Sequence, residues 1–121
     1  MSNKRDFKKS VDAVGGAVVS ELWLAYYNVK DADRNLITSA IGNLVAAITE
    51  ARAKANRFFG KGVREFADYK AYAAARKEFT KKNFDETLTE FNKALASALK
   101  DFNQALPESE RQANKAFAQE Q

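Results

Sequence analysis

Residues 36–48 read LITSAIGNLVAAI, and this stretch decides which fold classes are open to the rest of the chain. Its polar side chains are limited to Thr38, Ser39 and Asn43, and it contains no charged residue. A helix that is apolar on nearly all sides is either a membrane span or the central helix of a bundle. A membrane span requires roughly 17–25 residues, and this stretch is shorter. The sequence therefore predicts a buried helix at the centre of a bundle.

The composition of the 121-residue chain is typical of a single all-α domain covering residues 1–121. One proline and five glycines leave little material for the turns of a many-stranded sheet. The chain has no histidine and no cysteine, which excludes Ser-His and Cys-His catalysis, cysteine-based zinc sites and disulfide scaffolds. We expect no catalytic residues, metal or cofactor, although lysine or carboxylate catalysis stays open. Cysteine-free composition is also compatible with the cytoplasm, which is the location that we expect.

The first helix is predicted from Asn3 to Val29, because apolar residues recur there at spacings of three and four. These residues are Phe7, Val11, Val14, Val18, Leu22, Ala25 and Val29. Gly15 and Gly16 interrupt the pattern, and each costs roughly 1 kcal/mol relative to alanine in a helix. Their position predicts either a close crossing with another helix or a kink.

The opening sequence MSNKRDFKKSVDAVGGAVVSEL resembles the start of small uncharacterised α-helical proteins of Bacteroidetes. The likeness covers the first helix only, in which a lysine-rich run leads into a helix of small residues that contains an acid. It implies an all-helical bacterial protein. It implies no activity and no functional residue, because the family has no assigned function.

The second helix is predicted from Arg34 to Phe58, with Asp31 or Asp33 as its N-cap. Gly42 suggests a second close crossing, so that Gly42→Leu should destabilise the fold. The sequence Gly60-Lys61-Gly62 is expected to end this helix, with a glycine in the left-handed conformation.

Two further helices are predicted, at residues 63–80 and from Asn83 to Leu106. The break between them rests on Asn83 and Glu86, which are spaced as in a capping box, and on the rarity of very long helices. Pro107 should end the last helix. Residues 107–121 are expected to form a short, loosely docked helix or to fray. These elements together predict a four-helix, up-down-up-down antiparallel bundle with a short C-terminal helical appendage.

Positive charge is concentrated in residues 51–82, which carry a net charge of +7. A basic hairpin of this kind is a candidate for non-specific, salt-sensitive binding of nucleic acid or another polyanion. The simpler interpretation is a solvated face balanced by acidic neighbouring helices. The candidate polyanion-binding residues are Arg52, Arg57, Lys61, Arg64, Lys81 and Lys82.

Residues 63–80 depart from clean helical patterning, because aromatic and basic side chains alternate there. Such departures are often functional, although tyrosines at the edge of a core are also common. The candidate partner surface is Tyr72, Arg76 and Phe79, and Phe59 and Phe117 are further aromatic candidates. We expect a non-enzymatic interaction or scaffold protein that forms a homo-oligomer or binds a protein partner. Polyanion binding is the alternative, and a peripheral membrane role through the basic N-terminus and Trp23 ranks below both.

Overall fold

The computed structural model describes residues 4–107, which form three long α-helices and one short 3-10 helix. Helix α1 spans Lys4–Asn28 and α2 spans Arg34–Ala55. The 3-10 helix η1 spans Val63–Glu65, and α3 spans Tyr69–Ala105. No strand occurs between residues 4 and 107. The all-α class is therefore confirmed, whereas the prediction of four helices in the bundle is wrong.

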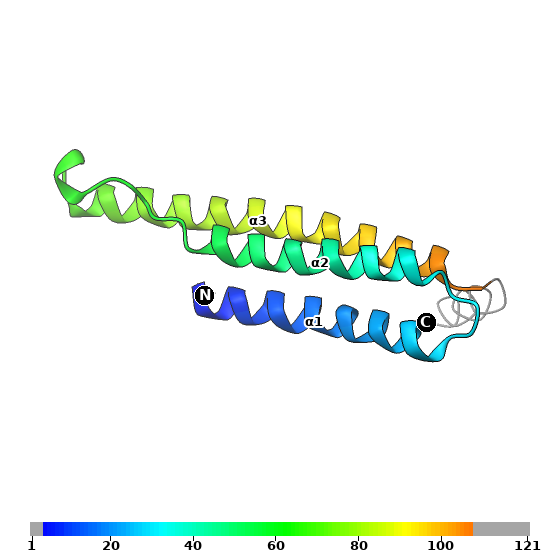
Figure 1. The fold of residues 1–121 in the computed structure, drawn as a ribbon. Coiled ribbons are helices and arrows are strands. Elements are labelled where there is room, and N and C mark those ends of the chain that lie inside the picture. Colours follow the sequence, from blue (N-terminus) through cyan, green and yellow to red (C-terminus); the bar gives the residue numbers. More distant parts are fainter. Residues whose placement is uncertain (1–3, 108–121) are drawn as a thin grey trace, which may run out of the picture.

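Helix α2 lies between α1 and α3 and packs along both of them (Figure 1). The chain runs up, down and up through the three helices, so α1 and α3 are parallel to each other. They touch only sparingly. At its N-terminal end α3 extends well past the described start of α1, and the connection from α2 runs outward along this extension to its tip.

The predicted break at Asn83 is absent, and α3 is one helix of 37 residues. Asn83 is buried, and its side-chain amide donates a hydrogen bond to the backbone carbonyl of Lys54 at 2.9 Å. The last four carbonyls of a helix have no partner within that helix, and Lys54 lies in the last turn of α2. Asn83 therefore satisfies the end of a neighbouring helix instead of starting a new one.

The 36–48 stretch supplies the centre of the core, as predicted, but only along one face. Ile37, Ala40 and Leu44 are completely buried and pack with Leu22 of α1 and Phe91 of α3. The opposite face is exposed and contains Thr38, Ser39, Gly42, Asn43 and Val45. Because only two helices flank α2, one side of the stretch remains open to solvent.

The glycines differ in their surroundings. A Cβ atom added to Gly15 would lie 2.6 Å from Cδ1 of Ile48, so α1 and α2 do approach closely at this point. Gly16 and Gly42 have no such neighbour within 4 Å. The predicted close crossing is present at Gly15, and it is wrong for Gly42, which faces outward.

The helix ends also correct the sequence-based boundaries. Asp33 is the N-cap of α2, and its carboxylate accepts a hydrogen bond from the amide of Leu36 at 3.1 Å. Helix α2 ends at Ala55, and neither Gly60 nor Gly62 adopts a positive φ. The left-handed residue among those described is Asp31, with a φ of 66°. Residues 108–121, which include Phe117, lie outside the described part of the chain.

Candidate binding groove

Among residues 4–107, no helix lies beside the N-terminal part of α3 on the side where α1 would continue. The rings of Phe7 and Phe84 stack with their centroids 4.8 Å apart, which aligns the start of α1 with this point of α3. The described part of α1 begins three residues before Phe7, whereas α3 begins fifteen residues before Phe84. The overhang is therefore about twelve residues, or roughly 18 Å of helix. We call residues 69–80 the α3 overhang.

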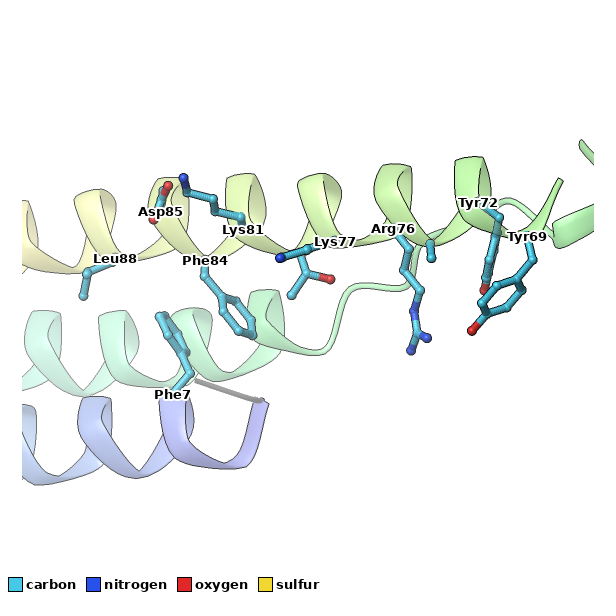
Figure 2. A pocket seen from close by; sticks show the side chains of 11 residues that line it. Phe7, Tyr69, Tyr72, Arg76, Lys77, Lys81, Phe84, Asp85 and Leu88 are labelled. Carbon is cyan, nitrogen blue, oxygen red and sulfur yellow. The ribbon is translucent and has the colours of Figure 1, made fainter. Parts of the chain in front are cut away.

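A groove of about 590 Å³ follows this overhang and ends against Phe7 of α1 (Figure 2). All of its other lining residues come from α3. They are Tyr69, Tyr72, Ala73, Arg76, Lys77, Thr80, Lys81, Phe84, Asp85 and Leu88. Tyr69, Tyr72 and Arg76 project from the same side of α3 as Phe84.

The order of the lining residues gives the groove two different edges and a narrow floor. Lys77, Lys81 and Asp85 follow one another at intervals of four and form one edge, because residues four apart lie on the same face of a helix. Tyr72 and Arg76 form the other edge by the same rule. Ala73, Thr80 and Phe84 lie between the two edges. The floor therefore consists of small side chains at Ala73 and Thr80 and an aromatic side chain at Phe84.

The connection between α2 and α3 packs against the overhang beside the groove. Phe59 of this connection packs against Phe66, Tyr72 and Phe79, with ring centroids 5.6–6.0 Å apart. Asp68 caps the start of α3, since its carboxylate accepts a hydrogen bond from the amide of Ala71 at 2.8 Å. These contacts hold the overhang as helix while its groove face stays open.

Two of the three residues of the candidate partner surface, Tyr72 and Arg76, line the groove. Phe79 does not line it and packs against Phe59, which Tyr72 also contacts. Sequence reasoning missed Phe7, Lys77 and Phe84 as members of one site. The alternating spacing of three and one from Tyr72 to Asp85 was the available signal, since it marks a single helix face. The contribution of Phe7 depends on how α1 packs and has no signal of its own.

The six candidate polyanion-binding residues are all exposed, and two of them make contacts with other side chains of the bundle. Arg52 pairs with Asp12 of α1, and the guanidinium of Arg57 donates a hydrogen bond to Oδ1 of Asn83 at 3.4 Å. Of the remaining four, Lys81 lines the groove. Lys61, Arg64 and Lys82 lie outside it.

The groove cations are free of the ion pairs that join the three helices. Within residues 4–107, Lys54 pairs with Glu50 at 2.9 Å and also with Glu90 of α3, but no ion pair engages Arg76, Lys77 or Lys81. The hydrogen bond from Lys54 lowers the pKa of Glu90, and the same bond, assisted by Glu50, raises the pKa of Lys54. The groove therefore has a positive rim that no described carboxylate neutralises by direct contact, with Asp85 its one acidic lining residue.

The described residues include neither a metal-binding cluster nor a membrane-spanning helix. They contain no group of three or more acidic side chains that could hold a metal ion. None of the helices between residues 4 and 107 is long and apolar enough to cross a membrane. No family model, curated protein or solved structure matches this chain.

Proposed function

We propose that this protein is a non-enzymatic helical interaction protein that binds its partner in the groove along the α3 overhang. The observation that carries the proposal is the groove itself, which has about 590 Å³ of volume and is lined by four aromatic side chains. Binding sites are concave, predominantly apolar and supplied with a few polar groups that fix orientation. Tyrosine and arginine, both present here, are the residues enriched at the energetic centres of protein interfaces.

Polyanion binding through the basic 51–82 region is the second candidate. It is supported by the presence of Arg76, Lys77 and Lys81 beside Tyr69 and Tyr72 in one groove. Stacking on aromatic rings and pairing with cations is how single-stranded nucleic acids are commonly bound. This candidate is weakened because two of the six predicted cations, Arg52 and Arg57, already contact side chains of the same molecule.

The first experiment asks whether binding depends on the groove. Peptides selected on the full chain from a displayed library without charge bias would be measured against wild type and against Ala73→Trp. Indole at position 73 fills the floor of the groove. We expect the selected peptides to lose at least about tenfold in affinity for Ala73→Trp, the loss that follows when a central contact worth about 1.4 kcal/mol is blocked.

Ala96→Trp is the matched control, because Ala96 is an exposed alanine of α3 that does not line the groove. It should bind the selected peptides as wild type does, and circular dichroism should show both variants folded. Peptides that bind Ala73→Trp as tightly as wild type would contradict the proposal. A labelled single-stranded oligonucleotide in the same assay tests the second candidate, whose binding must weaken as salt concentration rises.

A further inference from the structure

We infer that the occupant of the groove is an acidic amphipathic α-helix of a partner protein, lying along the α3 overhang in line with α1. This inference rests on the proposed function and adds the shape and the charge of the partner. Three features of the described residues support it: the periodicity of the groove, the length of the overhang and the sign of its rim.

The periodicity of the groove is that of a helix-packing face. Its lining residues recur along α3 in steps of three and one from Tyr72 to Asp85. The same face of α3, continued through Phe91 and Ala98, is buried in the core farther along the helix. In helix packing, small residues let a second helix approach, and larger ones fit between its side chains. Ala73 and Thr80 provide the small positions, with Tyr69 and Phe84 at the two ends.

The length of the overhang defines the length of the partner segment. About twelve residues of α3 extend past the start of α1, which corresponds to a helix of about three turns. A docked helix of this length would meet Phe7 at one end and Tyr69 at the other. An extended peptide could not form backbone hydrogen bonds with this surface, because α3 is a helix and presents no free strand edge for pairing.

The sign of the rim defines the charge of the partner. The groove lining includes three cations, Arg76, Lys77 and Lys81, and one acidic residue, Asp85. A second copy docked groove to groove would bring the same three cations to the interface, and like charges placed together across an interface disfavour binding. Glutamate or aspartate residues beside the apolar stripe of a partner helix would instead pair with the rim. The predicted partner therefore has apolar residues at spacings of three and four, flanked by acids.

The test uses three synthetic peptides of about 14 residues, enough for slightly more than three turns. The first has leucine and alanine on one helical face and glutamate beside it. The second has lysine in place of each glutamate, and the third is the acidic peptide with a central proline. We expect the full chain to bind the acidic peptide at least about tenfold more tightly than the basic one. The proline peptide should lose binding, because proline breaks the helix.

Charge reversal at the rim makes the inference specific to the groove. The double substitution Lys77→Glu and Lys81→Glu should reverse the preference, so that the basic peptide binds more tightly than the acidic one. Lys82→Glu is the matched control, because Lys82 is the exposed neighbour of Lys81 and does not line the groove. It should leave the preference for the acidic peptide in place.

Each contrary result has a distinct meaning. Equal affinity for the acidic and basic peptides would overturn the inference, as would an equal effect of Lys82→Glu and of the double substitution. Groove-dependent library peptides without an acidic bias would leave the proposed function standing and the inference wrong. A dimer in light scattering that Ala73→Trp abolishes would assign the groove to a second copy of this chain. Tighter binding of a single-stranded oligonucleotide than of the acidic peptide would assign it to nucleic acid.

Discussion

At the scale of single residues, Gly15 is where the packing of α1 against α2 leaves least room. A Cβ atom there would lie 2.6 Å from Cδ1 and 2.7 Å from Cγ1 of Ile48, and 3.4 Å from the ring of Phe91. Alanine at this position would force the Ile48 side chain to move within a packed interface. Glycine is therefore retained in the middle of a helix despite its lower helix propensity.

The substitutions Gly15→Ala and Gly16→Ala should consequently change stability in different ways. Gly16→Ala should raise the free energy of unfolding by about 0.5–1 kcal/mol, because it restricts the unfolded backbone and meets no atom within 4 Å. Gly15→Ala has the same helix-propensity gain but incurs an overpacking cost of about 1–3 kcal/mol. We expect Gly15→Ala to be about 1–3 kcal/mol less stable than Gly16→Ala in urea unfolding.

The adjacent positions make this comparison well controlled, since both substitutions add the same methyl group to the same helix. Equal stability of the two variants would show that Ile48 rearranges without cost. Gly42→Ala belongs with Gly16→Ala, because Gly42 also has open space around it. Helical periodicity in the sequence can only place a glycine within a helix. Whether that glycine lies at a close helix contact depends on the side chain that faces it, as Ile48 faces Gly15.

At the scale of elements, α3 shows which sequence signals are ambiguous. The spacing of Asn83 and Glu86 is that of a capping box, but the same asparagine side chain here donates to the carbonyl of Lys54 in α2. The hydroxyl of Thr87 donates to the backbone carbonyl of Asn83 at 2.7 Å, which is a bond within a continuous helix. A capping residue near the middle of a long periodic pattern therefore has two interpretations. Only the position of α2 distinguishes between them.

Elements whose apolar stripe is unambiguous were predicted closely. Helix α1 was expected at residues 3–29 and spans Lys4–Asn28, and α2 begins at the expected residue. The end of α2 was placed three residues too late, because Asn56 ends the helix with a φ of −88° and no left-handed glycine is needed. Local sequence patterns therefore predicted the helices but not how the helices pack against one another.

The ion pair between Lys54 of α2 and Glu90 of α3 gives the packing of these helices a pH dependence. Because the hydrogen bond from Lys54 lowers the pKa of Glu90, the pair stabilises the fold at neutral pH and is lost as pH falls through that lowered pKa. The raised pKa of Lys54 has the opposite sign, so its stabilisation is lost only as pH rises through it. Glu90→Gln should therefore lower Tm at neutral pH, and the difference from wild type should shrink in acid.

Thermal unfolding followed by circular dichroism at a series of pH values measures this difference. Glu86→Gln is the control, because Glu86 is an exposed carboxylate of the same helix without an ion pair among the described residues. It should show a smaller change at neutral pH. A difference between Glu90→Gln and wild type that stayed constant into strong acid would contradict the assignment to the ion pair.

At the scale of the whole molecule, the offset between α1 and α3 creates the candidate site. The sequence places Tyr72 and Arg76 on a helix and marks residues 51–82 as basic, and both features could be identified from it. The groove also depends on where α1 starts relative to α3, which the stacking of Phe7 on Phe84 establishes. Two rings 77 positions apart in the chain carry no local signal of this contact. The groove could therefore be identified only once the packing of the helices was known.

The same offset predicts that α3 is unevenly protected from hydrogen exchange. Local opening is easiest where few buried apolar contacts hold the backbone. Residues 74–80 have aromatic support on one side only, whereas residues 91–102 include Phe91 and Ala98 in the core. We expect amides of the overhang to exchange at least about tenfold faster than those of residues 91–102, which is an opening free energy lower by about 1.4 kcal/mol.

Exchange measured at several protein concentrations separates an open groove from a covered one. In the isolated chain the difference between the two halves of α3 should be independent of concentration. Protection of residues 74–80 that rose with protein concentration would show that a second copy covers the groove. Addition of the acidic helical peptide should slow exchange in residues 74–80 and leave residues 91–102 unchanged. Slowing confined to the overhang would place the bound helix beside the one segment of α3 that α1 does not reach.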